Sequence, residues 1–207
     1  MMTTQHTLDG GDLFVPLPEV DTEAQRRLHN RLAAAATKAG ILDVAYRTVA
    51  TPLGALLLAA TEKGLVRVAY GIQDHDRVLE QLASRVSPRV LHAPARLDLA
   101  AQQIEEYFAG RRTGFDLPLD LRLSAGFRRN VLTHLPKIPY GKTASYAELA
   151  AAAGHPKAVR AVGTACAMNP LPVVVPCHRV VRSDGTAGQY VGGTDAKKLL
   201  LTLEAAA

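Results

Sequence analysis

Three short apolar runs lie close together between residues 44 and 71, and they constrain the fold of this chain more than any other feature. The runs read VAYRTVA, ALLLAAT and LVRVAYG, a composition typical of strands. The first two are joined by TPLG, whose Pro52 and Gly54 suit a tight turn, and the last two by EKG. Connections this short predict an antiparallel meander, because parallel strands need a long crossover.

Helical patterns flank this predicted sheet. We expect helices over residues 21–39, 75–86 and 97–109. In the first of them, Leu28, Leu32, Ala35 and Ala36 fall at helical spacing, which predicts an amphipathic helix. The stretch FDLPLDLRL that follows the third helix contains a proline, so it is better suited to an edge or a linker than to a central strand.

The second half of the chain is predominantly helical. A helix is predicted over residues 124–135, and a second begins where Ser145 and Glu148 have the spacing of a capping box. Gly154 ends that helix, and Pro156 is suited to be the first residue of the next. Two helices separated by AGHP have the outline of a helix-turn-helix.

These patterns predict an α+β protein with three parts. Residues 1–40 form an N-terminal extension, made of an arm and a helix. Residues 41–122 form a small α/β domain with an antiparallel sheet, and residues 123–207 form a mainly helical domain that carries the helix-turn-helix. Hydrophobic residues make up 48% and charged residues 21% of the chain, an ordinary balance for a globular protein.

The composition excludes several functional classes. The two cysteines, Cys166 and Cys177, cannot form a disulfide framework or a four-cysteine zinc site. No apolar run approaches the ~20 residues that span a bilayer, and the first 30 residues do not resemble a signal peptide. We therefore expect a cytoplasmic protein with reduced thiols, no membrane partner and no metal. The net charge of +5 slightly favours polyanions such as nucleic acid.

The second helix of the predicted helix-turn-helix has two unlike faces. One face carries Lys157 and Arg160 among very small side chains, and the other includes Cys166 and resembles a core face. Small side chains allow a helix to approach another surface closely. The pattern alone leaves open whether Arg160 contacts DNA or lies on an ordinary solvated face, whereas Cys166 is most simply a buried small residue.

A thiol, an imidazole and a guanidinium stand on consecutive residues in VVVPCHRVV, at Cys177, His178 and Arg179. A free thiol is largely protonated at neutral pH, and cationic neighbours favour the thiolate. Adjacent side chains of an extended chain point to opposite sides, so a bridging water between Cys177 and His178 is as plausible as a direct contact. As a base, His178 needs an orienting acceptor, for which Glu204 is a candidate. Spacing alone leaves a catalytic pair and a structural pair both open.

The longer segment NPLPVVVPCHRVV, with the later GQYVGG, resembles the active-site signature of the O6-alkylguanine-DNA alkyltransferases. The likeness extends from about Phe127 to Glu204 and includes PYGKTASYAELA and GHPKAVRAVG. Residues 44–71 more weakly resemble the variable N-terminal domain of that family, which implies a ribonuclease-H-like fold. Residues 1–40 match no motif, so we expect them to pack on the N-terminal domain and to be dispensable for alkyl transfer.

The resemblance implies direct-reversal DNA repair without a cofactor. The alkyl group of O6-alkylguanine, and of O4-alkylthymine, in double-stranded DNA would pass irreversibly to Cys177 after the base is flipped out of the helix. The thioether formed is stable, so each molecule, acting as a monomer, would react once.

The resemblance also implies roles for individual residues. In the catalytic set, Cys177 accepts the alkyl group, His178 deprotonates it through a water, Glu204 orients His178, and Asn169 braces the preceding turn. The residues expected to contact the flipped base are Tyr146, Val180, Tyr190 and Val191. The residues expected to contact DNA are Arg160, which would fill the gap in the duplex, with Ala161, Gly163, Thr143 and Ser145.

Two alternative functions fit less of the sequence. A non-catalytic lesion-binding protein of the alkyltransferase-like kind would lack the cysteine, whereas Cys177 is present. A Cys-His hydrolase unrelated to DNA would leave Arg160 and Tyr146 unexplained. One departure from the family pattern is Val191, which stands where many relatives have serine and whose branched side chain could narrow the pocket against bulky alkyl groups.

Overall fold

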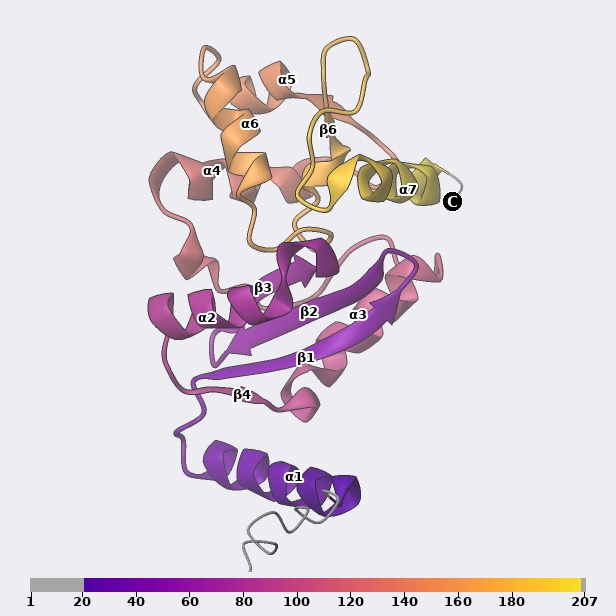
Figure 1. Cartoon of the computed structure of the whole chain (residues 1–207). Helices are drawn as coiled ribbons and strands as arrows, with labels where there is room; N and C mark the ends of the chain where they lie inside the picture. The colour runs from indigo at the N-terminus through magenta and orange to yellow at the C-terminus, as the bar shows by residue number, and fades with distance from the viewer. Residues whose placement is uncertain (1–20, 206–207) are drawn as a thin grey trace, which may run out of the picture.

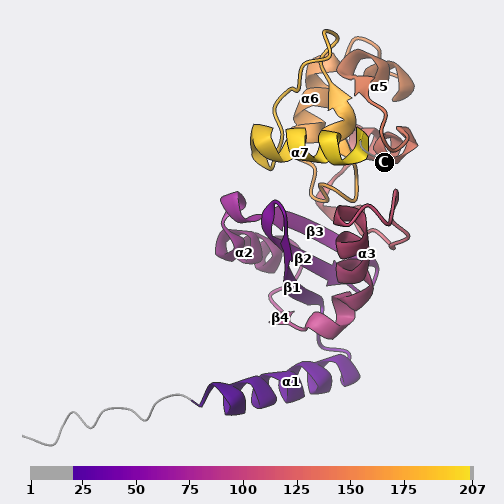
Figure 2. The ribbon, with the colours of Figure 1, turned by 90° about the vertical axis from the view of Figure 1, so that its right-hand side faces the viewer.

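The protein, represented here by a computed structural model that describes residues 21–205, consists of two stacked lobes (Figure 1). The first lobe is a sheet with helices on its faces, and the second is mainly helical. Helix α1 (Thr22–Lys38) lies at the end of the first lobe that is remote from the helical lobe, as both ribbon views show (Figure 2).

The sheet of the first lobe has four strands in the order β3-β2-β1-β4. Strands β1 (Val44–Thr51), β2 (Gly54–Thr61) and β3 (Gly64–Tyr70) form an antiparallel meander, which confirms that prediction. Strand β4 (Val90–His92) pairs in parallel with β1 and adds a fourth strand that the sequence did not predict. Three residues are too few to carry a recognisable strand pattern.

Helices α2 (His75–Arg85) and α3 (Asp98–Phe108) cover opposite faces of this sheet (Figure 2). Successive strand residues point to opposite faces, so Leu57 packs in the cluster under α2 while Leu56 and Leu58 belong to the cluster on the α3 side. Because both faces are covered, β2 reads as a continuous apolar run instead of an alternating one.

The linker between the lobes runs beside β3 as a single parallel bridge, Leu65 to Leu119. The amide of Leu65 donates to the Pro118 carbonyl at 2.8 Å, and the amide of Asp120 donates to the Leu65 carbonyl at the same distance. This close approach depends on Gly64, whose φ is +131° and whose missing Cβ would lie 2.1 Å from the Pro118 oxygen. The linker therefore fixes the position at which the second lobe begins.

Substitution Gly64→Ala is expected to destabilise the protein by about 2–5 kcal/mol, because backbone strain and overlap with Pro118 add together. The matched control is Gly54→Ala. Gly54 also has a positive φ, of +85°, but nothing lies within 4 Å of its added Cβ, so a loss of only about 1–2 kcal/mol is expected. Urea unfolding measures both variants, and equal losses would contradict the steric account.

The second lobe is built from α4 (Gly126–His134), α5 (Tyr146–Ala152), α6 (Val159–Ala167) and α7 (Gly193–Ala205). The predicted capping box at the start of α5 is confirmed. The amide of Glu148 donates to the Ser145 hydroxyl at 3.1 Å, and the Glu148 carboxylate accepts from the Ser145 amide at 2.6 Å.

Helix α6 begins at Val159, so the prediction that Pro156 is its first residue was wrong. The amide of Ala158 donates to the His155 carbonyl at 2.8 Å, which closes a turn that contains Pro156 between the two helices. The helix-turn-helix itself is present as α5 and α6, which pack against each other.

Helix α1 buries a different face from the one that its leucines suggest. Ala33 and Ala36 are buried, whereas Leu28 is 62% exposed and Leu32 is 57% exposed. The predicted apolar face was therefore right at Ala36 and wrong at its leucines, because small alanines allow this helix to approach the sheet lobe. The other half of the predicted extension, residues 1–20, lies outside the described residues.

Within residues 21–205, no helix combines the length and the apolar character that crossing a membrane requires.

Candidate active site

Cys177 begins a 3-10 turn, Cys177–Arg179, that leads into the short strand β6 (Val180–Val181). Strand β6 pairs in parallel with β5 (Ala144–Ser145), which directly precedes α5. The segment around Cys177 was predicted to be extended, and the turn corrects this. Every residue from 171 to 180 is buried, and Cys177 itself is 2% exposed.

Asn169 holds the loop that presents Cys177. Its carbonyl oxygen accepts from the Leu171 amide at 2.9 Å, while its amide group donates to the Val175 carbonyl at 2.8 Å and to Cys177 Sγ at 3.1 Å. Between these contacts Val173 has a φ of +71°, a strained conformation for a β-branched residue. One side chain thus braces a strained loop and hydrogen-bonds the sulfur.

The Cys177 thiol is protonated at neutral pH in the free protein. Burial raises its pKa to about 11, and the Asn169 hydrogen bond and the Lys197 charge only partly oppose this. Lys197, on α7, is fully buried and donates from Nζ to the Val180 carbonyl at 2.6 Å. Sequence reasoning missed Lys197, because nothing in the sequence distinguishes it from the exposed Lys198 beside it.

Alkylation of Cys177 by iodoacetamide is expected to be slow at pH 7 and to accelerate about tenfold per pH unit until the pH approaches 11, since the thiolate is the reactive form. The urea-unfolded protein should titrate near the ordinary cysteine pKa. Mass spectrometry of quenched samples follows the reaction at Cys177. A rate that levels off below pH 8 in the folded protein would contradict the buried, protonated thiol.

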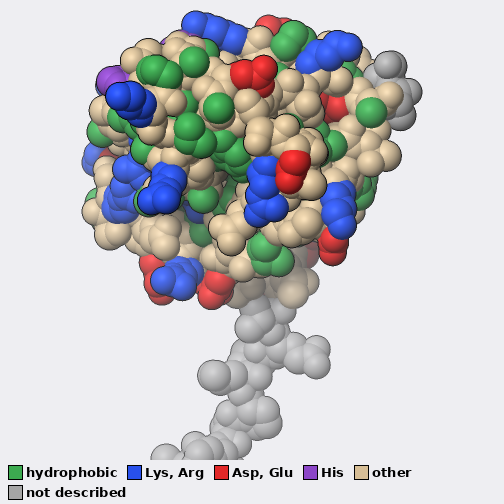
Figure 3. All heavy atoms as spheres, turned by 90° about the horizontal axis from the view of Figure 1, so that it is seen from above, with side chains coloured by type: hydrophobic (Ala, Val, Ile, Leu, Met, Phe, Trp, Pro, Cys, Tyr) green, Lys and Arg blue, Asp and Glu red, His purple; other side chains and the backbone are tan. Residues whose placement is uncertain are grey.

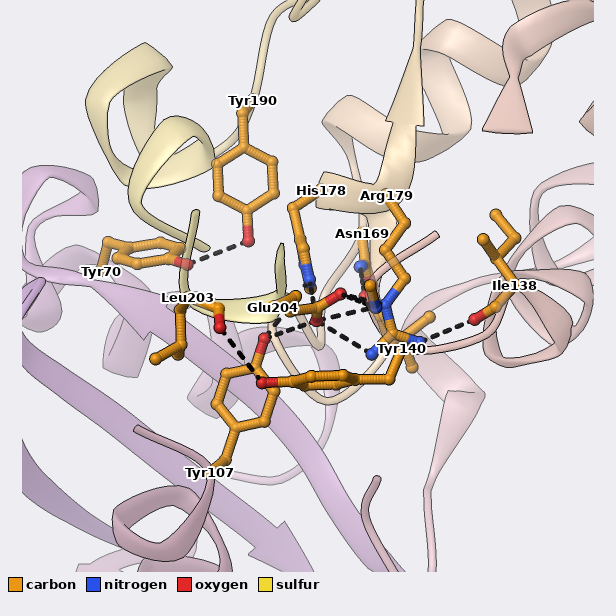
Figure 4. Close-up of polar contacts among 12 residues, drawn as sticks. Tyr70, Tyr107, Ile138, Tyr140, Asn169, His178, Arg179, Tyr190, Leu203 and Glu204 are labelled. Carbon is orange, nitrogen blue, oxygen red and sulfur yellow. Dashed lines mark hydrogen bonds and ion pairs between the residues drawn. The ribbon is translucent and has the colours of Figure 1, made fainter. Parts of the chain in front are cut away.

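His178 is fully buried, and its Nε2 lies 2.8 Å from Glu204 Oε1 (Figure 4). Burial alone would raise the pKa of Glu204, but hydrogen bonds from His178 and Arg179 outweigh it and lower the pKa to about 2. Glu204 is therefore an ionised acceptor, and Nε2 of His178 carries the proton. Burial lowers the pKa of His178, so the imidazole is neutral. Its Nδ1 is then an unprotonated acceptor, and among the described residues this buried atom has no hydrogen-bond partner.

Arg179 does not act on the thiol, which corrects one reading of the sequence. Its Nε lies 2.9 Å from Glu204 Oε2, its Nη2 lies 2.9 Å from Oε1, and its Nη1 donates to the Ile138 carbonyl at 2.7 Å (Figure 4). The guanidinium thus fixes the charge of the carboxylate that orients His178. Both partners are almost completely buried.

The first lobe also contributes side chains to this site. Tyr107 on α3 donates from its hydroxyl to Glu204 Oε1 at 2.7 Å, and the hydroxyls of Tyr70 and Tyr190 lie 2.9 Å apart (Figure 4). Sequence reasoning missed Tyr70 and Tyr107, because they lie in the part of the chain with only a weak motif. The Glu204 network therefore joins the two lobes.

The residues expected to contact the flipped base differ in how deeply they are buried. Tyr146 and Tyr190 are half-buried near Cys177, and the pKa of each is raised, chiefly by burial and also by Cys177. Val191 follows Tyr190 and is also half-buried. Val180 is fully buried, so only its backbone could take part, and its carbonyl already accepts from Lys197.

The residues expected to contact DNA lie on or before the two helices of the helix-turn-helix. Thr143, Arg160 and Ala161 are exposed, and Gly163 has open space where a Cβ would stand. Ser145 is half-buried, and its hydroxyl caps α5. Figure 3 looks down on the second lobe from this end and shows Lys and Arg side chains spread around a partly apolar middle.

A helix-turn-helix with an exposed arginine, next to two buried hydrogen-bonded pairs, Asn169 with Cys177 and His178 with Glu204, is the arrangement of a class of protein, the DNA-binding transferases with a nucleophilic cysteine. In the described part of the chain, no three His, Cys, Asp or Glu side chains are grouped so that they could hold a metal ion.

Comparisons with known proteins agree with this class. The 6-O-methylguanine DNA methyltransferase DNA-binding domain matches residues 126–206, and the ribonuclease-like domain of the same family matches residues 44–121. A methylated-DNA–protein-cysteine methyltransferase of Mycolicibacterium paratuberculosis is 42% identical over 161 residues, which cover 78% of this chain and 92% of the relative. The constitutive Bacillus subtilis enzyme of the same name is 39% identical over 163 residues, covering 77% of this chain and 94% of the relative.

Solved structures give the same result. Mycobacterium tuberculosis O6-methylguanine methyltransferase superposes with a TM-score of 0.68 at 38% identity, covering 79% of this chain and 93% of that one. The M. tuberculosis OGT in complex with DNA gives a TM-score of 0.69 at 39% identity, covering 78% and 93%. The chain therefore belongs to the 6-O-methylguanine DNA methyltransferase family, which confirms the resemblance seen in the sequence.

Proposed function

We propose that this protein repairs DNA directly, by transferring the alkyl group of O6-alkylguanine in duplex DNA to Cys177. The observation that carries the proposal is a pair of buried contacts on neighbouring residues: Asn169 hydrogen-bonds the sulfur of Cys177, and Glu204 hydrogen-bonds Nε2 of His178, whose Nδ1 has no partner among the described residues. A cysteine in these surroundings can act as a nucleophile once a base removes its proton.

The lesion must first leave the base stack. Extruding one nucleotide costs a few kcal/mol, and Arg160 at the exposed start of α6 is placed to offset part of this cost by filling the gap. The small side chain of Ala161 and the open space at Gly163 allow the helix to lie close to the groove.

The chemical step is a single displacement. Nδ1 of His178 accepts the thiol proton through a water, and Glu204 stabilises the imidazolium that forms. The sulfur attacks the alkyl carbon, the bond from that carbon to O6 breaks, and guanine leaves with a proton in place of the alkyl group. Tyr146, whose raised pKa keeps it protonated, is the hydrogen-bond donor that we assign to the departing base. The proton that the guanine gains is balanced by the thiol proton taken up by His178, so the site ends neutral.

Substrate must displace part of the cover over Cys177, which is only 2% exposed. The segment that contains Tyr190 is the part of this cover that we expect to shift; its contacts with Tyr70 are one hydrogen bond between the hydroxyls and the edge-to-face packing of the two rings. Val191 in the same segment would restrict bulky alkyl groups.

The test of the proposal is mass spectrometry of the protein after it is mixed with a duplex that contains one O6-methylguanine. One added methyl group on the peptide that contains Cys177, saturating at one per protein, would support it, with Cys166 as an unmodified internal comparison. Tight binding to the same duplex without a change in mass would instead favour a non-catalytic lesion-binding protein.

Substitution Arg160→Ala is expected to slow transfer from a methylated duplex by about tenfold or more, because less of the lost stacking is replaced. Reaction with the free base O6-methylguanine should be unchanged, since that substrate requires no base flipping. Lys157→Ala is the matched control for the loss of one positive charge next to α6. An equal loss of reaction with the free base would show that Arg160 acts on the pocket and not on the duplex.

The remaining expectations are also proposals. Residues 41–122 would form a supporting domain and residues 123–207 the DNA-binding and alkyl-transfer domain, with residues 1–40 dispensable for transfer. We infer that the protein acts as a monomer, that O4-alkylthymine is a second substrate, and that the need for a reduced thiol places the reaction in the cytoplasm.

A further inference from the structure

A cavity of about 200 Å³ lies between the lobes, lined by α2 and β3 on one side and by α4 and the end of α6 on the other. Figure 1 shows α2 and α4 on the same side of the molecule, one in each lobe. Three arginines line the cavity, namely Arg67 of β3, Arg85 of α2 and Arg128 of α4, and no carboxylate lines it.

These arginines lack the counter-charges that others in the chain possess. Arg47, for example, is paired with Asp98, whereas Arg67, Arg85 and Arg128 form no ion pair within residues 21–205. Nε of Arg67 is buried and has no hydrogen-bond partner among the described residues. Buried polar atoms are nearly always partnered by protein, water or ligand, so this N–H is a donor available to a ligand in the cavity, as is the buried Nε of Arg47 elsewhere in the molecule.

We propose that this cavity binds a small oxyanion of the phosphate type. Guanidinium groups recognise phosphate oxygens through paired N–H donors, and a multivalent anion would offset the mutual repulsion of the three arginines. The amide groups of Gln73 and Gln81 also line the cavity and can supply further donors. The volume accommodates several waters or one such ion.

A bound anion would tie the two lobes together behind the active-site loop. Asn169 and Pro170 line the cavity, and the Pro170 carbonyl accepts from the Val68 amide of β3 at 2.8 Å. Asn169 is also the residue whose amide donates to Cys177 Sγ. Occupancy would therefore stabilise the folded state and brace the loop that carries the nucleophile.

The site suits free phosphate better than a phosphate of the DNA backbone. Met168, at the end of α6, lines the cavity, whereas Arg160 stands at the start of the same helix. A separation of eight residues corresponds to about 12 Å along a helix, so the cavity lies away from the end of α6 that we assign to DNA.

The experiment is titration of the full chain with inorganic phosphate at constant ionic strength, followed by isothermal calorimetry and by the melting temperature. A saturable rise of the melting temperature with one site per protein is expected. Arg85→Gln should weaken phosphate binding by about tenfold or more, since it removes a charge-assisted contact. The matched control Arg77→Gln lies on the same helix outside the cavity lining and should bind as the wild type does.

Three results would overturn the proposal. The first is a melting temperature that rises with phosphate but does not saturate, and the second is a rise of equal size with chloride. The third is phosphate binding that is weakened equally by Arg85→Gln and by Arg77→Gln. If Arg85→Gln does not fold, Arg128→Gln provides the same test. Displacement of phosphate by undamaged duplex would reject the free anion and assign the site to the DNA backbone. None of these measurements uses alkylated DNA, so their outcome is independent of the proposed alkyl transfer.

Discussion

Replacing Cys177 with serine is expected to abolish alkyl transfer while leaving the binding of lesion-containing duplex within a fewfold of the wild type. A serine hydroxyl is a much weaker acid than a thiol and a much poorer nucleophile, so it would not displace guanine from the alkyl carbon at a measurable rate. The proposed DNA contacts at Arg160 and Ala161 are exposed on α6, whereas Cys177 is buried below them. Methyl transfer followed by mass spectrometry and duplex binding followed by fluorescence anisotropy measure the two properties separately.

The matched control is Cys166→Ala, which removes the other cysteine of the chain. Cys166 is buried on α6, and burial raises its pKa above that of Cys177, so it should contribute nothing to transfer. Full activity of Cys166→Ala together with loss of activity in Cys177→Ser is the expected pair of results. Residual stoichiometric transfer in Cys177→Ser would assign the acceptor role to another residue.

The sequence predicted correctly those elements that are specified by a few neighbouring residues. The meander followed from short turns such as TPLG, and the capping box followed from the spacing of Ser145 and Glu148. The start of α6 at Val159 was misplaced, because a proline that suits a first helical turn suits a tight turn equally well. The packing face of α1 was only partly predicted: Ala36 is buried as expected, but the leucines that gave the stronger part of the pattern are exposed.

The candidate site was predictable only where a long motif covered it. Two residues that match the motif, Asn169 and Glu204, contact Cys177 and His178 respectively, and the roles that we assign to them are proposals. Lys197, Tyr70 and Tyr107 were missed, because their roles depend on tertiary contacts between distant segments. The hydroxyl of Tyr107, for instance, meets a carboxylate 97 residues further along the chain. Arg179 was misread because an extended chain, and not a 3-10 turn, was assumed around Cys177.

Substitution Glu204→Gln is expected to slow transfer at least about a hundredfold and to destabilise the fold by about 3–5 kcal/mol. The carboxylate accepts hydrogen bonds from His178, Arg179, Tyr107 and the Gly141 amide, and each of these groups is a donor. An amide would turn its own NH₂ group toward one of these donors and would leave the buried Arg179 without a counter-charge. His178 would also lose the anion that stabilises its protonated form, which accounts for the slower transfer.

The dependence of stability on pH separates this network from a general packing defect. Because the pKa of Glu204 is lowered to about 2, its stabilising contribution is present above the ordinary glutamate pKa and is lost as the pH falls toward 2. The difference in unfolding free energy between the wild type and Glu204→Gln should therefore shrink as the pH falls from 5 to 3, whereas Glu105→Gln, at an exposed position of α3, should match the wild type throughout. If this difference in unfolding free energy stayed constant from pH 5 to 3, Glu204 would stabilise the fold by its shape and not by its charge. The buried Arg179 would then be tolerated without a charged partner.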